Sequence, residues 1–318
     1  MIPTLHQTTI EVVRPIPDHV GAGVPATLTL RVRCSAGCCI IDAPVRLVDA
    51  SGAVLDVNYA AGLADGEVDA VVTAPACVGE VAWLAVCARH ARESGVHEES
   101  APVEIRFRAV AHTTSMAVWD VPSPVTAGSA LSATVGVRCT EGCALTGAQV
   151  QVWDESGACV GDGRLGTTPW GGTAALHWAE IALTAPTTEG LTVRRAALAS
   201  DTVALPHDAA DASFTFMTTP RPEHQVEVTV VDTVTGAGLA DVEVRVGLYP
   251  MRSDAAGSAR VEVPRGTYEI WIRKDGFSAK PIEVSVTADL AVRVEAQKVP
   301  TMAERAETLS SFEGFPWG

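Results

Sequence analysis

The chain has 318 residues and a formal net charge of −15, with 47% hydrophobic residues and only 5% aromatic ones. Such a length predicts about two or three domains, and the apolar fraction is ample for packed cores, which argues against a disordered chain. The net charge argues against nucleic acid as a partner, because phosphate backbones bind clustered Lys and Arg. Valine, alanine and threonine are abundant, and this bias favours β-strands.

The first residues of the chain, 1–7, show no charged start followed by an apolar core. No apolar run along the sequence reaches the length of a transmembrane helix. We therefore expect no secretory leader and no membrane span. A cytoplasmic protein with reduced thiols is the simplest interpretation.

Two stretches of the chain repeat one another. Residues 33–52 read R-C-S-A-G-C-C-I-I-D-A-P-V-R-L-V-D-A-S-G, and residues 138–157 read R-C-T-E-G-C-A-L-T-G-A-Q-V-Q-V-W-D-E-S-G. The two stretches align without a gap, and the same spacing places residues 8–9 on residues 113–114. The first two-thirds of the chain is therefore a duplication, which predicts one fold present twice.

Short alternating segments separated by turn residues fill the first unit. Leu28, Leu30 and Val32 would share one strand face, and the Asp49–Gly52 segment has the signature of a type I turn. We expect a β-sandwich for this unit and for its repeat, and both resemble immunoglobulin-like domains in strand number and order. The predicted strands of the first unit cover residues 9–13, 26–33, 44–48, 53–59, 68–73, 80–88 and 103–108.

The third unit, residues 220–298, follows a proline-rich linker. Its succession D-x-x-T-G-x-x-L-x-x-V-x-V, then D-x-x-G, then G-x-Y-x-I-x-I-x-x-x-G-F resembles the carboxypeptidase regulatory-like family. That resemblance implies a small transthyretin-like sandwich that serves as an accessory module. The matching positions are Asp232, Thr235, Gly236, Leu239, Val242, Val244, Asp254, Gly257, Gly266, Tyr268, Ile270, Ile272, Gly276 and Phe277.

The last residues, 299–318, differ in character from the rest of the chain. They carry Phe312, Phe315 and Trp317 among Gly and Pro, too few apolar residues to form a core of their own. Large aromatic side chains dominate the energetics of protein interfaces. We expect this tail to dock onto a protein partner or onto another copy of the chain; the alternative is that it folds back on the third domain.

A repeated cysteine pair is the sharpest candidate for a chemical site. Each pair follows a predicted strand, and a histidine with an acidic neighbour (Glu98 or Asp208) would lie in a loop at the same end of the sandwich. Two thiolates, an imidazole and a carboxylate could close a tetrahedral zinc site. The candidate metal ligands are Cys34, Cys38 and His97 in the first unit and Cys139, Cys143 and His207 in the second.

Two other interpretations of the cysteine pairs remain open at this point. C-x3-C is looser than the usual zinc-knuckle spacing, so the cysteines could be small buried residues that shape a tight loop. They could also form local disulfides in an oxidising environment. We expect no cofactor, with zinc as the possible exception.

Two further patterns suggest binding sites. Residues 161–166 spell G-x-G-x-x-G, but the residues after them are unsuited to open a helix, so we expect a loop and no dinucleotide site. A tryptophan-bearing insertion around Trp170 and Trp178 could stack on sugars, although core filling and loop anchoring are the usual roles of such residues.

The sequence therefore predicts an all-β chain of three tandem β-sandwich domains, with boundaries at 1–109, 110–219 and 220–298, and a docking tail at 299–318. No G-x-S-x-G, P-loop or H-E-x-x-H motif appears, so we do not expect an enzyme. The preferred function is a non-catalytic structural or accessory subunit, a scaffold in a larger assembly. The alternatives are a carbohydrate- or surface-binding protein and a zinc-binding module.

Overall fold

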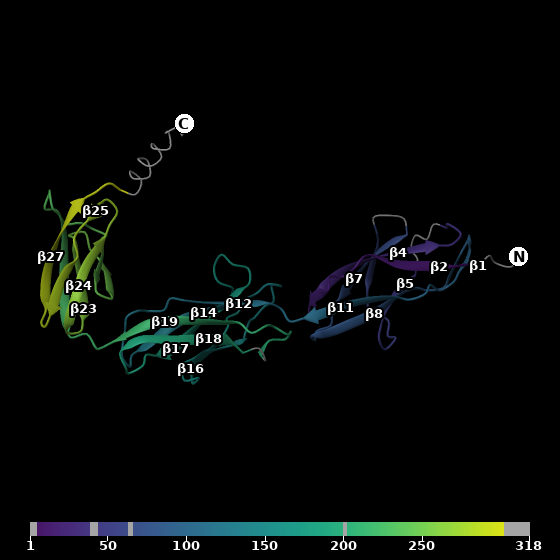
Figure 1. Cartoon of the computed structure of the whole chain (residues 1–318), viewed down its shortest axis with the longest axis horizontal. Coiled ribbons are helices and arrows are strands. Elements are labelled where there is room, and N and C mark those ends of the chain that lie inside the picture. Colours follow the sequence, from purple (N-terminus) through teal and green to yellow (C-terminus); the bar gives the residue numbers. More distant parts are fainter. Residues whose placement is uncertain (1–4, 39–43, 63–65, 200–201, 302–318) are drawn as a thin grey trace, which may run out of the picture.

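The computed structural model describes residues 5–38, 44–62, 66–199 and 202–301. These residues form strands β1 to β27 and no α-helix, which confirms the prediction of an all-β chain. The strands form three β-sandwich units that follow one another in space as they do in sequence (Figure 1).

The first domain is built from two four-stranded sheets and one small three-stranded sheet. Their orders are β2-β4-β7-β6, β3-β11-β8-β5 and β1-β10-β9. The strands are β1 (Leu5–His6), β2 (Thr8–Arg14), β3 (His19–Gly21), β4 (Pro25–Cys34), β5 (Val45–Asp49), β6 (Asn58–Ala61), β7 (Glu67–Thr73), β8 (Gly79–Cys87), β9 (His90–Arg92), β10 (Gly95–His97) and β11 (Val103–Val110).

The second domain repeats this plan with a three-stranded sheet, β12-β14-β17, and a five-stranded sheet, β13-β19-β18-β15-β16. Its strands are β12 (Thr114–Trp119), β13 (Val125–Thr126), β14 (Ala130–Cys139), β15 (Gln149–Trp153), β16 (Cys159–Arg164), β17 (Leu176–Thr184), β18 (Gly190–Leu198) and β19 (Asp211–Thr219).

The third domain has two four-stranded sheets, β23-β20-β27-β25 and β22-β21-β24-β26. Its strands are β20 (His224–Asp232), β21 (Glu243–Val246), β22 (Tyr249–Arg252), β23 (Ser258–Val263), β24 (Gly266–Arg273), β25 (Phe277–Ser278), β26 (Ile282–Val286) and β27 (Leu290–Lys298).

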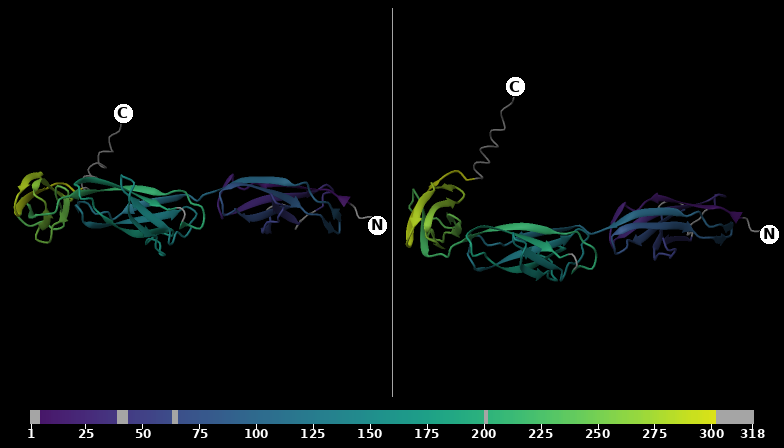
Figure 2. Two further views of the ribbon diagram at one scale, coloured as in Figure 1. Left: turned by 90° about the horizontal axis from the view of Figure 1, so that it is seen from below. Right: turned by 60° about the horizontal axis from the view of Figure 1, so that its bottom comes forward.

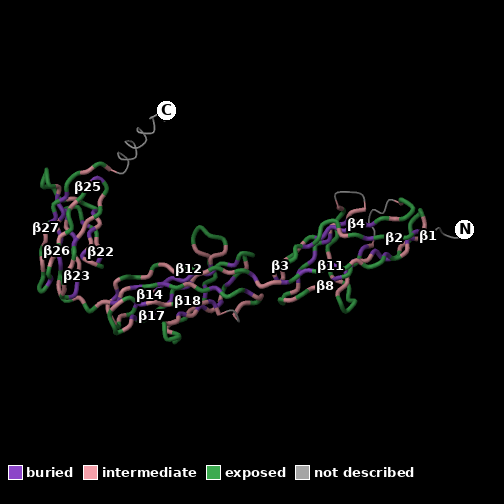
Figure 3. The backbone as a smooth tube through the Cα atoms, viewed as in Figure 1, coloured by how far each residue is buried: buried purple, intermediate pink, exposed green. Residues whose placement is uncertain are grey.

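Each domain encloses its own apolar core, and the buried residues of each core lie within one domain only. In β4, Leu28 and Leu30 are fully buried and Val32 nearly so, as their alternation predicts. Burying side chains of this size contributes about 1.5–3 kcal/mol each. Figure 3 shows buried and exposed positions alternating along the strands of all three domains. The cores therefore follow directly from the period-two pattern of the sequence.

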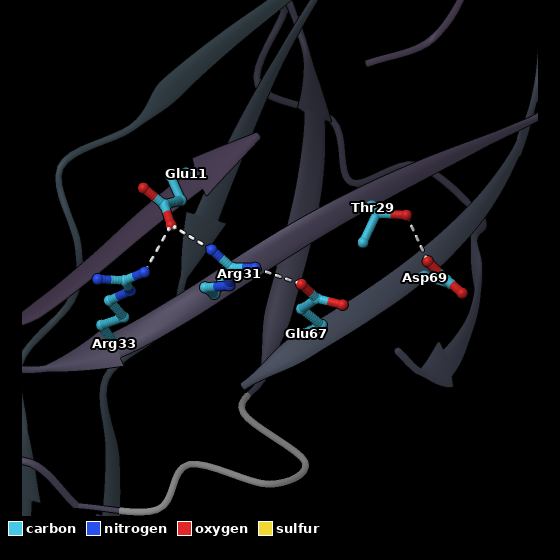
Figure 4. Close-up of polar contacts among 6 residues, drawn as sticks. All are labelled: Glu11, Thr29, Arg31, Arg33, Glu67 and Asp69. Atoms are coloured by element: carbon cyan, nitrogen blue, oxygen red, sulfur yellow. Dashed lines mark hydrogen bonds and ion pairs between the residues drawn. The ribbon is translucent and has the colours of Figure 1, made fainter. Parts of the chain in front are cut away.

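The outer face of the first domain is polar where β2, β4 and β7 lie side by side (Figure 4). Arg31 on β4 bridges Glu11 on β2 and Glu67 on β7. Two residues before Arg31 on the same strand, the hydroxyl of Thr29 donates a hydrogen bond of 2.6 Å to the carboxylate of Asp69. Cross-strand pairs of this kind fix the register of a sheet whose other face is buried.

The three domains lie end to end, so the described part of the chain is elongated (Figures 1 and 2). Residues 111–113 connect β11 to β12, and residues 220–223, which include two prolines, connect β19 to β20. Linkers this short leave little freedom between neighbouring domains.

One β-bulge changes how the two repeated domains align. In the first domain Thr8 pairs with Cys34, and the register shifts between Val12 and Arg14. In the second domain Thr114 pairs with Cys139, with no shift along the strand. The structural counterpart of Thr8 is therefore Thr114, one residue beyond the position that the gapless alignment indicates.

Two local predictions are wrong. Residues 53–59 do not form one strand: Val54 makes an isolated bridge to Val48, and β6 begins only at Asn58, because the chain crosses here from one sheet to the other. Residues 161–166 lie largely in strand β16 and not in a loop. A Cβ atom on Gly161 or Gly163 would approach β17 side chains to 2.6 or 2.5 Å, so glycine allows the close contact between these strands.

No described residue belongs to a helix that is long and apolar enough to cross a membrane.

Candidate metal centres

Site 1 is a cluster of four side chains in the first domain: His6, Cys34, Cys38 and His97. One nitrogen or sulfur atom of each lies within 4.8 Å of all the others. The parallel pairing of β1 with β10 places His6 directly beside His97. Their ring centroids are 5.1 Å apart and nearly perpendicular.

The two cysteines of site 1 are positioned by a tight turn. Strand β4 ends at Cys34, and Gly37, with φ of 71°, closes the turn by donating its N–H to the Cys34 carbonyl at 3.0 Å. A positive φ of this size favours glycine, so the turn explains why the residue just before Cys38 is a glycine. The turn carries the Sγ atom of Cys38 to 3.2 Å from Nδ1 of His6.

Site 2 is the equivalent cluster in the second domain: His112, Cys139, Cys143 and His207. Its ligand atoms also lie within 4.8 Å of one another. Nδ1 of His112 is 3.0 Å from Sγ of Cys143 and 3.8 Å from Sγ of Cys139. An isolated parallel bridge pairs His112 with His207, as β1 and β10 pair the histidines of site 1.

Most of the donor atoms are buried and several have no partner. His97 is fully buried, and neither of its ring nitrogens has a hydrogen-bond partner. His207 donates from Nδ1 to the carbonyl of Leu205 at 2.8 Å, but its buried Nε2 has no partner. Buried polar atoms in folded proteins are almost always satisfied, so these nitrogens are available as ligand atoms.

Hydrogen bonds outside site 2 determine which histidine nitrogens face the cluster. Nε2 of His112 lies 2.7 Å from the carbonyl oxygen of Ala22, which can only accept a proton. In a neutral His112 ring Nδ1 is then the nitrogen that carries the lone pair, and it faces the two sulfur atoms. A histidine whose second nitrogen donates to a backbone carbonyl is the usual arrangement at metal sites.

The local environment moves the pKa values of the cluster in different directions. Burial raises the pKa of the Cys143 thiol to about 11, with the hydrogen-bonded Cys139 thiol adding to the effect. Burial also opposes ionisation of Cys34, but hydrogen bonds, led by the Ala36 N–H, outweigh it and lower its pKa. Burial, followed by the neighbouring His90 and His6, lowers the pKa of His97, which keeps its imidazole neutral.

The chemistry of this donor set is that of a closed structural metal site. Two sulfur and two imidazole donors at one point suit a single tetrahedral ion, whereas a catalytic site leaves one position open. At site 2 the raised pKa of the Cys143 thiol is the opposite of what a nucleophilic cysteine needs. The donor geometry of both clusters suits ligation of a metal ion.

The structure brings all six predicted cysteine and histidine residues into the two clusters, but it replaces the expected fourth ligand. In site 1 the carboxylate of Glu98 lies 3.4 Å from the Arg89 guanidinium, and His6 lies at the cluster instead. In site 2 the fourth member is His112 and not Asp208. Strand pairing accounts for this, since the histidine partner lies beside His97 or His207 and the acid is one residue further along.

The seven cysteines among the described residues are free thiols, so no disulfide links Cys34 to Cys38 or Cys139 to Cys143. Cys39 lies outside the described residues. The predicted docking residues Phe312, Phe315 and Trp317 also lie outside the described part of the chain.

The predicted tryptophan site is a second candidate. Trp170 packs edge-on against Trp119 at 4.9 Å and against Trp178 at 5.2 Å, so these rings anchor the insertion to the sheet. Trp170 and Trp178 also line an open pocket of about 690 Å³, together with Arg164 and Glu180. Aromatic faces beside charged groups are compatible with sugar binding, but the rings are already used in packing one another.

Comparisons with known proteins extend only to solved structures. No family model matches the chain, and no curated protein matches it. Native α2-macroglobulin from Escherichia coli, in a structure spanning domains MG0-NIE-MG1, is 13% identical with a TM-score of 0.32, covering 88% of this chain and 97% of that one. The Yersinia pseudotuberculosis adhesin InvE is 16% identical with a TM-score of 0.28, covering 66% of this chain and 58% of that one.

The major pilin subunit BcpA of Bacillus cereus is 11% identical with a TM-score of 0.24, covering 92% of this chain and the whole of that one.

Proposed function

We propose that this protein is a non-catalytic scaffold that holds its binding partners at a fixed separation in a larger assembly. The observation that carries the proposal is the end-to-end arrangement of three independently cored β-sandwiches joined by short linkers (Figure 1). Such an arrangement gives length and stiffness, which a compact enzyme domain does not need. The free thiols favour a reducing compartment such as the cytoplasm.

The aromatic tail is the proposed docking element. Phe312, Phe315 and Trp317 are the kind of anchors that dominate interface energies, and the third domain is complete without them, since its last strand ends at Lys298. A chain ending at Pro300 would therefore lose the docking element and keep the three cores.

Affinity purification from native lysate, with the full chain and the chain ending at Pro300, tests this function. We expect a partner or self-assembly that disappears on truncation and also in a full-length F312A/F315A/W317A variant. Small-angle scattering of both forms should show the same elongated particle. A compact particle, or tail variants with unchanged associations, would overturn the scaffold proposal.

The pocket beside Trp170 favours one second candidate function, binding of a carbohydrate surface. Glycan-array binding that is lost in Trp178→Ala, with unchanged folding, would support it. A chain that binds no glycan, or binds glycans equally well without Trp178, removes this candidate.

A further inference from the structure

We propose that sites 1 and 2 each bind one Zn²⁺ through two thiolates and two imidazoles, and that the ion of site 2 fixes the first domain against the second. In a tetrahedral zinc site with bond lengths of about 2.0–2.3 Å, the ligand atoms lie about 3.3–3.8 Å apart. The donor atoms of both clusters already lie within 4.8 Å of one another. Only small side-chain movements separate them from ligation.

Zinc also gives a partner to one unsatisfied nitrogen at each cluster. One of the two partnerless nitrogens of His97, and the Nε2 of His207, would coordinate the ion instead of lying buried without a hydrogen bond. A buried nitrogen that is left without a partner destabilises the folded state. A divalent ion removes this penalty for one nitrogen at each site.

The donor set selects the class of ion. Thiolate and imidazole ligands in a tetrahedral arrangement suit Zn²⁺, whereas Mg²⁺ and Ca²⁺ prefer oxygen ligands in larger shells. No carboxylate belongs to either group of four. The ligand sets therefore point to a soft or borderline ion, and zinc has no redox chemistry that would disturb a structural role.

The second domain keeps all four donors although nearby positions have changed. Cys87 faces Val45 in the first domain, and its counterpart Leu198 faces Val150 in the second, so a cysteine outside the cluster was not retained. In contrast, each of the four cluster positions holds the same residue type in both domains. Shared ligation accounts for this pattern better than apolar packing, which accepts Leu or Val as readily as Cys.

Site 2 differs from site 1 because one of its ligands contacts two domains. His112 lies in the linker, and its Nε2 donates to Ala22, in the loop that follows β3 of the first domain. The same loop contacts the second domain through Gly23, where a Cβ atom would lie 3.2 Å from the Leu205 side chain. The Leu205 carbonyl in turn accepts the Nδ1 proton of His207.

An ion at site 2 would therefore fix both sides of the junction at once. It would hold His112 and His207. The second nitrogen of His112 is bonded to the loop of the first domain, and the second nitrogen of His207 is bonded to Leu205, which this loop contacts. We expect loss of this ion to free the linker, while loss of the ion at site 1 should leave the junction unchanged.

The first experiment measures zinc by mass spectrometry of the elements in protein purified with zinc and a reductant, without chelator. We expect about two ions per wild-type chain, about one in Cys38→Ser or His6→Ala, and about one in Cys143→Ser. The matched controls are Glu98→Gln and Cys159→Ser, which should keep two. Cobalt added in place of zinc should give the visible absorption of a tetrahedral thiolate complex at both sites.

Some results would overturn the metal proposal. A wild-type chain purified in this way that binds no zinc overturns the proposal, and a parallel sample purified without reductant whose mass lacks one hydrogen per thiol would show disulfides instead. Equal zinc content in His6→Ala and Glu98→Gln would show that the histidine is not a ligand. Should a cysteine variant fail to fold, zinc titration of the chelated wild-type chain, followed by cobalt absorption, decides the question.

The second experiment measures amide hydrogen exchange at the junction. We expect peptides covering residues 18–25 and 108–116 to exchange at least about tenfold faster after chelation, and equally fast in Cys143→Ser with zinc present. Cys38→Ser with zinc should keep the slow exchange. Exchange that is unchanged by chelation at the junction, with two zinc ions bound, would overturn the interdomain part of the proposal. These results do not depend on any docking partner.

Discussion

Sites 1 and 2 have the same four ligands in different surroundings. Site 1 lies at the far end of the first domain, near β1, where His6, His97 and His90 form a row across three short strands. Site 2 lies at the junction, and the linker residue His112 bonds to the domain before it. With zinc bound as proposed, the same four-residue cluster would stabilise one domain from within and join two domains, depending on what the outer histidine nitrogens contact.

The largest expected effect is a loss of thermal stability on chelation in the first two domains but not in the third. Zinc at about a thousand times its dissociation constant adds about 4 kcal/mol to the free energy of unfolding. For domains of this size, we expect chelation to lower two unfolding transitions by at least about 10 °C. Differential scanning calorimetry with and without chelator measures this shift.

The third domain is the internal control for that measurement, because no Cys/His group of four occurs among its described residues. Its unfolding transition should stay within about 2 °C on chelation. Equal shifts of all three transitions would show a general effect of the chelator and contradict the comparison.

Removal of the His90 side chain should lower the zinc affinity of site 1 and leave that of site 2 unchanged. Its ring stacks on His97 at 4.8 Å with an interplanar angle of 9°, and its Nδ1 donates to the Ala88 carbonyl at 2.9 Å. We expect His90→Ala to lower the zinc affinity of site 1 about tenfold, because residues that orient a ligand have effects of this order. Competition with a chelator in a Cys143→Ser background measures site 1 alone, and an unchanged affinity would show that the stacking has no role.

A methyl group added at Gly21 of the first domain should disturb only the junction. A Cβ atom on Gly21 would lie 3.0 Å from the ring of His112 and 2.9 Å from Val24. We expect Gly21→Ala to speed exchange at the linker several-fold while two zinc ions remain bound. Gly79→Ala, where a Cβ atom meets nothing within 4 Å, is the matched control.

The smallest expected effect tests whether the repeats are alike away from the two sites. The hydroxyl of Ser51, followed by the Ala53 N–H, lowers the pKa of Asp49, and Ser156 and Ala158 do the same for Asp154. A lowered pKa contributes stability that is present above the unfolded value of about 3.9 and is lost as the pH falls through the folded value.

We therefore expect Asp49→Asn to be less stable than wild type at pH 6, with a difference that shrinks below about pH 4. Asp154→Asn should behave alike in the second domain. Chemical unfolding across this pH range measures both, and an effect in one domain only would show that the repeats differ beyond their metal clusters.

Much of the fold could be predicted because it rests on local patterns. The alternation around Leu30 indicated a strand with one buried face, and Asp49 and Gly52 indicated the turn that the structure contains. The very short strands β1, β9 and β10 carry too few residues to show a period, so the histidine row that they form could not be seen in the sequence.

The missing fourth ligands had a sequence signal, but the bulge at residues 12–14 concealed it. A gapless alignment places His6 on Ala111, whereas in the structure His6 and His112 occupy equivalent positions in the two clusters. Allowing one inserted residue aligns His-Gln-Thr with His-Thr-Thr. The sequence indicates Glu98 and Asp208 as fourth ligands because each directly follows a histidine, but neither acid belongs to a cluster in the structure.

The position of His112 within the linker also has a mechanical consequence. Residues 111–113 could span roughly 10 Å if they were fully extended. The backbone of His112 is already bonded to Pro206 and Asp208 of the second domain, and a bond from its side chain to an ion would fix the same point a second time. Under tension along the long axis, such a clamp would transmit force with little slack, so the metal would add stiffness to a junction that the short linker and these backbone bonds already hold.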